Sequence, residues 1–565
     1  MSEMPFEPPP RTSVVDTRRD QIFPTLSARD FDRLRRFGEV RAFPDGAFIM
    51  KAGTVAPGLA FVLTGLIDVR QGGVATGFRS IVQHGPGTFL GELAQLSDRP
   101  ALVDAVAQGA VEAIVVPARR LRDVLVQEAE LGERIMRALI LRRVGLLEAG
   151  QAGPILIGPF GTGDMLRLEN FLTRNGHPHR SLDSGSDPCA RTLQAQFQVQ
   201  PEHLPIVLCP DGEILRNPSE RDLARCLGLL KQIDADTVYD AAIVGSGPAG
   251  LACAVYAASE GLSALVLDCR SFGGQAGASS RIENYLGFPT GISGLALMAR
   301  AYNQAQKFGA EIAIPDEAAS LGPDSDGEAR FHLKLANGET VRSRAVVIAS
   351  GARYRRLDIH NLSDFEGGCV HYWASAVEAR LCQGGDVALT GAGNSAGQAV
   401  VFLAGKVRKL WMVVRGASLE ASMSRYLIER IRALPNVEVL LRHEICGLEG
   451  EGAALRKVIW KHRDTGERTT REIGHVFSFI GAEPNTDWLD GCGVKRDGKG
   501  FVLTGQDGRH ALETCRDGVF AVGDVRCGSV KRVAAAVGEG STVVSALHAW
   551  LAKERERLGA REAAE

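Results

Sequence analysis

Two stretches of the chain share one hydrophobic pattern. In each, a short apolar run rich in β-branched residues leads into a glycine-rich turn and then a helix of small residues. They are Ala242–Gly250, AIVGSGPAG, and Val387–Gly397, VALTGAGNSAG. The first glycine of such a turn permits the tight bend, and the second lets the backbone approach a pyrophosphate that rests on the helix N-terminus. The pattern therefore predicts two strand–turn–helix sites for dinucleotides.

The N-terminal part of the chain is patterned differently. Residues 1–20 are polar and proline-containing, which is typical of a disordered tail. Between Phe31 and Val116, short β-like runs are separated by glycines. The stretch Ala118–Glu148 then repeats apolar residues at roughly helical spacing, at Leu121, Val124, Leu131, Ile135, Leu139 and Ile140. We expect a glycine-punctuated β domain followed by a long amphipathic helix.

Two junctions divide the rest of the chain. Residues 150–163 form a glycine-rich linker, and a second junction falls at residues 234–240. Small strand-like and helix-like segments alternate over residues 154–232, and the dinucleotide-binding region runs from the second junction to about residue 551. The alternation of strands and helices predicts a multidomain α/β protein.

Composition narrows the class of protein. A chain of 565 residues is too long for one core, and 45% hydrophobic residues with a mean hydropathy of −0.02 are ordinary for a globular protein. A net charge of −2 gives no footprint for nucleic acid. No apolar run is long enough to cross a bilayer or to serve as a signal peptide. We expect a cytoplasmic protein without nucleic-acid or membrane partners.

The eleven cysteines are scattered along the chain, and no two lie three positions apart. A CxxC redox motif and the spacing of a zinc site are therefore both missing from the sequence. We expect no metal site and mostly reduced thiols.

Further motifs accompany the first glycine turn. The strand SALVLD ends in Asp268, where a carboxylate can hydrogen-bond a ribose hydroxyl. GGQAG follows at 273–277, IENYLGFPTGISG at 282–294 and GVFAVGD at 518–524. Asp524 can reach a ribityl hydroxyl, and the helix after it can direct backbone N–H groups to the pyrimidine end of a flavin. These motifs predict an FAD site.

In this order the motifs resemble those of the low-molecular-weight thioredoxin reductases, the class II pyridine nucleotide-disulfide oxidoreductases. The resemblance covers residues 238–551 and includes IGxxPNT at Ile480–Thr486. It implies two Rossmann-like domains with three-layer ββα architecture in a homodimer: an FAD-binding domain of residues 238–355 and 485–565, and an NAD(P)-binding domain of residues 356–484. The FAD contacts that it implies are Gly245, Gly247, Pro248, Ala249, Gly250, Asp268, Gly274, Gln275, Asn284, Gly523, Asp524, Arg532 and Val533.

The second glycine turn is followed by the strand KLWMVVRG, which ends at Arg415. An acid at that point would favour the free 2′-hydroxyl of NADH, whereas an arginine favours the 2′-phosphate of NADPH. The family usually carries a His-Arg-Arg cluster here, of which this chain keeps one arginine. Arg425 is either a second phosphate contact or a solvated helix residue. The NADPH contacts expected are Gly391, Gly393, Asn394, Ser395, Ala396, Arg415 and Arg425.

The redox dithiol of the thioredoxin reductases is missing from its usual place. The family context is VxYCATC, and the corresponding segment here, residues 370–376, reads VHYWASA. Trp373 and Ala376 replace the two cysteines, and neither side chain can take part in thiol–disulfide exchange. Cys369 and Cys527 are better explained as packed, structural residues. No catalytic residue is assigned with certainty.

Residues 21–148 resemble the cyclic-nucleotide-binding domain of bacterial sensor regulators, a β-roll with a long C-terminal helix. The resemblance makes Gly91, Glu92 and Leu93 candidate effector contacts. The arginine and Ser/Thr that normally bind the cyclic phosphate are replaced by Ala101 and Asp104, which oppose an anionic ligand. Arg99 is either a substitute cation or an ordinary surface residue. No helix-turn-helix follows, which argues against a transcription factor.

Residues 154–232 resemble a small thioredoxin or glutaredoxin fold. Pro205, in LPIVLCPDGEIL, stands where that fold carries a cis-proline. Residues 175–178 fit its second strand region and residues 223–230 its last helix. The redox motif should follow the first strand at 154–157, but the segment there, GPFGTGDM, has no cysteine. We expect this domain to be redox-inactive.

Together these observations favour an FAD-dependent NADPH oxidoreductase of the thioredoxin-reductase type. Electrons would pass from NADPH through the flavin to an acceptor that the sequence does not identify, a small redox protein or a small molecule. One alternative is a reductase of ferredoxin or another one-electron carrier. Another is a flavin-based redox sensor with an N-terminal regulatory domain.

Overall fold

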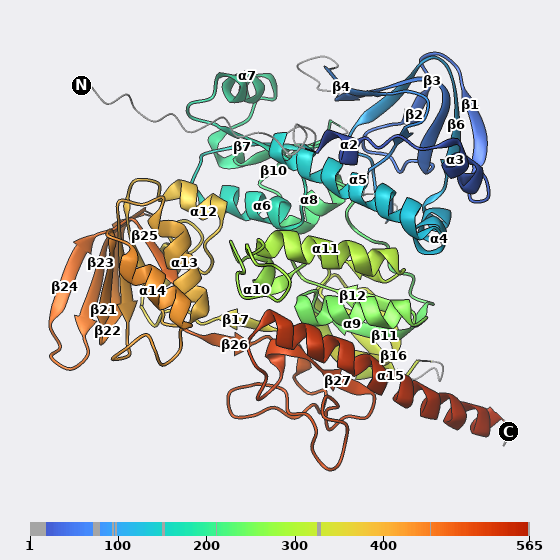
Figure 1. Ribbon diagram of the computed structural model, residues 1–565. Helices are drawn as coiled ribbons and strands as arrows, with labels where there is room; N and C mark the ends of the chain where they lie inside the picture. Colours follow the sequence, from blue (N-terminus) through green and yellow to red (C-terminus); the bar gives the residue numbers. More distant parts are fainter. Residues whose placement is uncertain are drawn as a thin grey trace. The chain divides into compact units, whose positions relative to one another are not determined.

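A computed structural model describes residues 18–71, 79–92, 95–96, 99–149, 153–210, 212–324, 329–452 and 454–562 (Figure 1). The predicted tail, residues 1–20, lies mostly outside these residues. The chain forms two compact units. The first comprises residues 1–157, 177–182 and 206–229, and the second comprises residues 158–176, 183–205 and 230–565.

The N-terminal part of the first unit is a β-roll. Its sheet has the strand order β1-β6-β3-β4, with β2 beside β6 and β5 beside β3. The alternating apolar positions of β3 and β6 bury Phe61 and Ile114 completely, against Phe89. The elements are α2 (Arg19–Ile22), α3 (Ala28–Leu34), β1 (Glu39–Phe43), β2 (Phe48–Met50), β3 (Leu59–Gln71), β4 (Arg79–His84), β5 (Phe89–Leu90) and β6 (Asp104–Val116).

The expected long helix over Ala118–Glu148 is two helices, α4 (Ala118–Gln127) and α5 (Ala129–Ala149). Glu128 leaves the helical conformation with φ −110° and ψ 75°. Gly132 permits the close packing of the two helices, because a Cβ there would lie 2.9 Å from the Leu125 Cα. The apolar stripe, including Leu121, belongs to the core of the β-roll. It therefore forms intramolecular core, the more common role of such a stripe.

A second sheet of the first unit has the order β10-β9-β7-β8. The cis peptide predicted at Pro205 is present, immediately before β9. The second strand and the last helix lie a few residues away from their predicted positions. The elements are β7 (Ile155–Gly158), β8 (Arg180–Asp183), β9 (Ile206–Leu208), β10 (Ile214–Arg216) and α8 (Glu220–Cys226).

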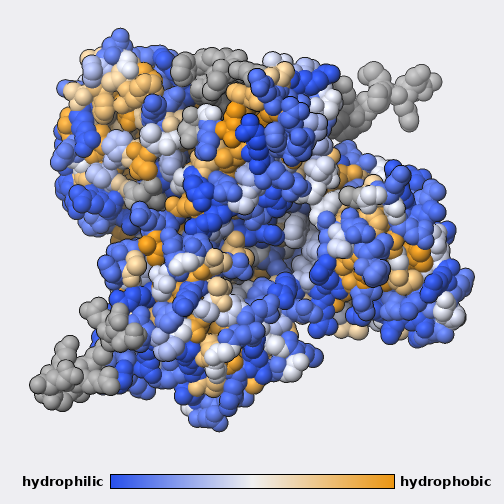
Figure 2. Space-filling view, turned by 180° about the vertical axis from the view of Figure 1, so that it is seen from behind, coloured by the Kyte–Doolittle hydropathy of each residue, from blue (hydrophilic) through white to orange (hydrophobic). Residues whose placement is uncertain are grey.

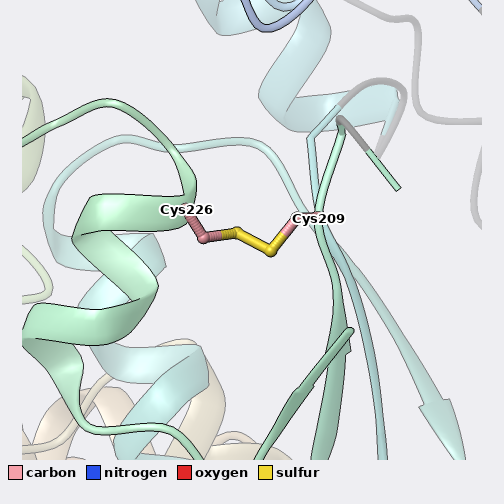
Figure 3. The surroundings of a disulfide bond; sticks show 2 residues. All are labelled: Cys209 and Cys226. Carbon is pink, nitrogen blue, oxygen red and sulfur yellow. A yellow bond between two sulfur atoms is a disulfide. The ribbon is translucent and has the colours of Figure 1, made fainter. Parts of the chain in front are cut away.

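A disulfide joins Cys209, just after β9, to Cys226, at the end of α8 (Figure 3). The spacing of the cysteines along the chain did not indicate this pair, because only close spacings identify a redox or metal motif. The fold brings together two residues that are 17 positions apart, with their Cα atoms 6.0 Å from each other. Cys209 and Cys226 are therefore an exception to the expected reduced state, whereas the other nine cysteines are free thiols.

The second unit begins with α6 (Gly163–Arg174) and α7 (Pro188–Gln196) and then forms a large sheet of order β13-β12-β11-β16-β15-β14, with β27 beside β16. The strands β13, β12, β11, β16 and β27 are parallel, and β15 and β14 are antiparallel. The elements are β11 (Val238–Val244), α9 (Pro248–Ser259), β12 (Ala264–Leu267), α10 (Gly274–Gly277), α11 (Gly294–Lys307), β13 (Glu311–Ala313), β14 (Ala318–Pro323), β15 (Phe331–Leu335), β16 (Thr340–Ile348), β27 (Val519–Ala521) and α15 (Val533–Glu562).

A second, all-parallel sheet has the order β18-β25-β19-β20-β21, and an antiparallel sheet of order β22-β23-β24 follows β21. Between the two dinucleotide-binding regions the chain crosses twice, as β17 (Ala352–Tyr354) and β26 (Ala482–Pro484), which pair with each other. The other elements are β18 (Val370–His371), α12 (Ala376–Leu381), β19 (Asp386–Thr390), α13 (Asn394–Ala404), β20 (Lys409–Val414), α14 (Arg425–Ala433), β21 (Val437–Leu441), β22 (His443–Glu451), β23 (Ala454–His462), β24 (Arg468–Glu472) and β25 (His475–Ser478).

The multidomain α/β fold, with an N-terminal β-roll and two dinucleotide-binding regions, is thus confirmed. On the face shown in Figure 2, hydrophilic residues surround smaller hydrophobic patches. Among the described residues, no helix combines the length and the apolar character needed to cross a membrane.

Candidate functional site

The first glycine turn connects β11 to α9. Gly245 has φ +111°, and a Cβ there would lie 2.2 Å from the Ala349 carbonyl oxygen. At Gly250 a Cβ would lie 1.9 Å from the Gly245 carbonyl oxygen, so only glycine allows α9 to pack this closely on the turn. In contrast, the space beside Gly247 is open apart from the Gly274 Cα at 4.0 Å. The turn therefore leaves exposed backbone at the N-terminus of α9, as a bound pyrophosphate requires.

Asp268 follows β12 and reaches back to this turn. One of its carboxylate oxygens accepts hydrogen bonds from the Ser246 N–H and hydroxyl, at 2.9 and 2.8 Å. The other accepts from the backbone N–H groups of Arg270 and Ser271. These four bonds fix the carboxylate beside the turn, where a ribose hydroxyl would share or replace one of them. Sequence reasoning missed Ser246, which occupies the variable position of the glycine motif.

The GGQAG segment is attached to the same turn. The Gly273 N–H donates to the Ser246 carbonyl oxygen at 2.8 Å, and the Gln275 side-chain amide donates to the Ala352 carbonyl oxygen of β17. Gly274 lies beside Gly247, and Asn284 lies on an exposed loop closed by the bridge between residues 282 and 292. The structure thus brings Gly274 and Gln275 to the turn, whereas Asn284 is placed on the loop surface.

The GVFAVGD segment meets the turn from the other side. A Cβ on Gly523, which has φ +74°, would lie 2.8 Å from the Ala249 Cβ, and the Gly523 N–H donates to Glu539 at 2.7 Å. Burial raises the pKa of the Asp524 carboxyl, and the Glu539 charge adds to this, whereas the Lys531 charge opposes it.

Arg532 and Val533 form the start of α15. The Arg532 carbonyl oxygen accepts the Ala536 N–H, and Val533 is the first helical residue. The Arg532 side chain is exposed. Their contribution to a flavin site would therefore come from backbone N–H groups at the helix N-terminus.

The second glycine turn connects β19 to α13 in the same manner. Gly391 has φ +142°, and a Cβ there would lie 2.6 Å from the Phe479 carbonyl oxygen, while the space at Gly393 is open. Asn394 accepts the Ser424 N–H at 2.7 Å with its side-chain oxygen. Ser395 is exposed and Ala396 is buried at the start of α13. This turn therefore provides a second open helix N-terminus.

Arg415 and Arg425 differ in their surroundings. Arg415 is exposed directly after β20, and its carbonyl oxygen accepts a hydrogen bond from the Arg463 guanidinium at 3.4 Å. Arg425 begins α14 with its side chain 92% exposed and paired with Glu429 at 2.8 Å. The structure thus places a further cation, Arg463, at Arg415, which sequence spacing could not reveal because it comes from the turn after β23.

Tyr354, which sequence reasoning missed, joins the two sites. It lies on β17, and its hydroxyl is hydrogen-bonded to Ser395 of the second turn. Its ring packs edge-on against Phe479, with the ring centroids 5.3 Å apart. Burial raises the pKa of the Tyr354 hydroxyl, and the charge of Asp524 adds to this rise. Tyr354 therefore contacts the second glycine turn directly and is influenced by the charge of the GVFAVGD segment.

A hydrogen-bonded network occupies the position of the family's dithiol. The indole N–H of Trp373 donates to the Glu378 carboxylate at 2.9 Å, and the same carboxylate, 2% exposed, accepts from the Ser375 N–H at 3.0 Å and the Asn170 amide at 3.1 Å. The Arg174 guanidinium lies 5.8 Å from the Trp373 ring centroid. Ala376 is the exposed first residue of α12.

The two neighbouring cysteines have structural contacts. The Cys369 sulfur accepts the Leu455 N–H at 3.4 Å. Cys527 is hydrogen-bonded to Asp497, which raises the pKa of its thiol. Burial, together with the charge of His475, lowers the pKa of nearby His371 to about 3, so this imidazole is neutral at pH 7. These contacts support the structural role expected for both thiols.

The effector candidates of the β-roll are occupied by protein groups. Glu92 is buried, and its two oxygens accept from the Leu102 N–H at 3.1 Å and the Arg143 guanidinium at 3.3 Å. The Gly91 carbonyl oxygen accepts from Arg142 at 2.9 Å. The Asp104 carboxylate accepts a hydrogen bond from the Ala52 N–H at 2.8 Å, so a structural role accounts for this residue without a ligand. Leu93 lies outside the described residues.

Two glycine turns, each open at a helix N-terminus, are the features of an oxidoreductase that uses two nucleotide cofactors. Residues 239–540 match the family model for pyridine nucleotide-disulphide oxidoreductases, and the chain belongs to this family. The family implies FAD and a nicotinamide nucleotide as cofactors, and the turns, Asp268 and Asp524 fit them. Residues 40–128 match the cyclic nucleotide-binding domain model.

Individual relatives support the same assignment. The chain is 32% identical over 325 residues to a thioredoxin reductase of Mycolicibacterium smegmatis, covering 57% of this chain and 99% of the relative. A thioredoxin reductase of Aquifex aeolicus is 31% identical over 322 residues, which span 57% of this chain and 96% of the relative. The crystal structure of T. acidophilum thioredoxin reductase matches with a TM-score of 0.51 and 28% identity, over 55% of this chain and 98% of that one.

Proposed function

We propose that this protein is an NADPH-dependent FAD oxidoreductase whose electron acceptor is not reduced through a dithiol at the family's usual position. The observation that carries the proposal is the pair of glycine turns that leave open space at Gly247 and Gly393, each at the N-terminus of a helix. When bound, FAD would accept a hydride from the nicotinamide and pass electrons on to the acceptor. The chain's own residues would bind and orient both cofactors: Asp268 and Asp524 at the first site, Arg415 at the second.

The acceptor is proposed to be a one-electron carrier such as ferredoxin, another small redox protein or a small molecule. The replacement of the dithiol by Trp373, held by Glu378, supports this over disulfide reduction. The cyclic-nucleotide-binding-like domain favours a second candidate, a redox sensor that turns over little. Rapid reduction of the bound flavin by NADPH supports the enzyme, whereas a flavin inert to NADPH supports the sensor. NADPH oxidation should then be followed with ferredoxin, quinones, disulfides and oxygen.

Replacing Asp524 by alanine should weaken FAD retention. The carboxylate is partly buried and would accept a hydrogen bond from a ribityl hydroxyl, and a hydrogen bond to a charged group contributes about 1.5–3 kcal/mol. FAD retained after gel filtration, measured by absorbance against protein, checks this. Asp487→Ala is the control, since that side chain is 74% exposed and paired with Arg353. Equal retention in both variants would exclude Asp524 from the site.

Arg415→Ala should narrow the preference for NADPH over NADH. Loss of a charge-assisted contact with the 2′-phosphate is worth about 1–3 kcal/mol, and it should appear as a change in the ratio of flavin reduction rates with the two nucleotides. Arg425→Ala is the matched control, because that side chain is already paired with Glu429. An unmodified protein that reacts equally with NADPH and NADH would contradict the assignment of Arg415.

Other expectations remain proposals. They are the domain boundaries, the thioredoxin-like character of residues 154–232, a cytoplasmic location and the homodimer. Light scattering at micromolar concentration tests the last of these, and a monomeric mass would contradict it.

A further inference from the structure

The Cys209–Cys226 pair is built from two different elements. Cys209 follows β9, and its N–H donates to the Glu213 carbonyl oxygen at 2.8 Å in the turn before β10. Cys226 is the last residue of α8. Only 6% of Cys209 is exposed, whereas Cys226 is partly exposed. Figure 3 shows the bond running from the helix end to the strand end. The bond therefore fixes the end of α8 to the sheet, and the cysteine at the helix end is the more accessible of the two.

The chain after Cys226 leads directly to the β-roll. Gly228 has φ +60°, and a Cβ there would lie 2.2 Å from the Pro100 ring, so the Gly228 backbone packs closely against that ring. Pro100 forms an isolated antiparallel β-bridge with Val55. Two residues further on, the Leu102 N–H donates a hydrogen bond to Glu92. A short path of contacts therefore runs from the disulfide through Gly228 and Pro100 to Glu92.

A second contact meets the same region. His177 is buried, and the charges of Arg143 and Arg99 lie close enough to help burial lower the pKa of its imidazole to about 3. Arg143 is the residue that pairs with Glu92. The charge of Arg143, the partner of Glu92, thus also acts on His177, which lies just before β8. Movement of this domain would change the surroundings of Glu92 from two sides.

We propose that Cys209–Cys226 is a thiol–disulfide exchange site for a dithiol reductant, and that its redox state controls the contact of Gly228 with Pro100 and thereby the position of Glu92. This role goes beyond the proposed oxidoreductase activity and does not require it. The surroundings of Glu92, within the cyclic nucleotide-binding domain match, would then respond to thiol redox state.

The exchange proceeds in two steps. A thiolate of the dithiol attacks the partly exposed Cys226 at its sulfur and forms a mixed disulfide; the Cys209–Cys226 bond breaks, and the Cys209 sulfur leaves as a thiolate that takes a proton from water. The second thiol of the reductant then loses its proton and attacks the reductant's other sulfur, which is bonded to Cys226 in the mixed disulfide. That bond breaks, and Cys226 leaves as a thiolate that takes up a proton. The protein disulfide is reduced to two thiols, and the dithiol is oxidised to a disulfide.

The experiment compares the full-length protein before and after treatment with dithiothreitol, without denaturant. N-ethylmaleimide labelling and peptide mass analysis should find Cys209 and Cys226 modified only after reduction. Amide hydrogen exchange of peptides covering residues 99–104 should become several-fold faster, and it should return to its starting rate after reoxidation. Cys189→Ser, which removes an exposed free thiol, should respond as the unmodified protein does.

Two variants separate the bond from the contact. The Cys209→Ser/Cys226→Ser protein should show fast exchange at residues 99–104 with no response to dithiothreitol. Gly228→Ala, with the disulfide intact, should show the same fast exchange, because its Cβ pushes Pro100 away. A disulfide that resists dithiothreitol in the folded protein, or equal exchange at residues 99–104 in the two redox states, would overturn the proposal. The unmodified protein alone decides this if a variant does not fold.

Discussion

Titration of the FAD-loaded protein with NADPH should consume about one two-electron equivalent per flavin, because among the described residues no disulfide stands at the family's redox position to store a second pair of electrons. The residues at the usual positions of that disulfide are Trp373 and Ala376. The Trp373 indole is held by the buried Glu378, so the space is filled by a side chain that cannot exchange with thiols. For the same reason, NADPH-dependent reduction of thioredoxin should be absent while the flavin itself is reduced.

The measurement is an anaerobic titration followed by flavin absorbance, with a thioredoxin assay beside it. Cys369→Ser is the control for the nearest remaining thiol, and it should leave the stoichiometry unchanged. Consumption of about two equivalents, or efficient thioredoxin reduction, would mean that electrons from the flavin reach a disulfide, either Cys209–Cys226 or one formed by other cysteines. The explanation of this site by Trp373 would then be wrong.

Gly540→Ala should release FAD, whereas Gly538→Ala should not. Both glycines lie on α15. A Cβ at Gly540 would lie 2.2 Å from the Ala249 carbonyl oxygen, which is backbone of α9 beside the first glycine turn. To relieve this clash, α15 must move away from α9, and overpacking of this kind destabilises a protein by about 1–3 kcal/mol. The same movement would displace Gly523, and with it Asp524, because Gly523 packs on Ala249.

The space at Gly538 is open, and alanine there should stabilise the helix by at most about 1 kcal/mol. Flavin content after gel filtration and the temperature of flavin release compare the two variants. Similar flavin content in both would show that the close approach of α15 to α9 is not needed for the site.

The sequence predicted the parts of this protein that depend on local backbone geometry. The glycines at 245 and 391 were recognised because a tight turn with positive φ excludes other residues. Tyr354 was missed because it lies on a short connecting strand and acquires its role only when Ser395 and Asp524 approach it. Sequence periodicity carries no information about such meetings of distant segments.

Two other findings needed the three-dimensional structure for similar reasons. The disulfide joins residues whose separation matches no redox motif. Only the fold, which brings the end of α8 beside the end of β9, reveals it. The division of residues 118–148 into two helices depends on Gly132 packing on Leu125, while the apolar spacing continues through the break. A pattern of buried positions therefore predicted the right face but not the number of helices.

Both oxygens of Glu92 are taken by Leu102 and Arg143, and this has a kinetic consequence for the β-roll. Because Glu92 is only 5% exposed, a ribose hydroxyl can reach this carboxylate only in molecules where one of those two partners has moved aside. The observed dissociation constant of any nucleotide would exceed the intrinsic one by the inverse of that open fraction. Its association rate would level off at high concentration, at the rate of opening. Leu102 and Arg143 would thus act as an intramolecular competitor of the nucleotide, and diluting the protein would not weaken this competition.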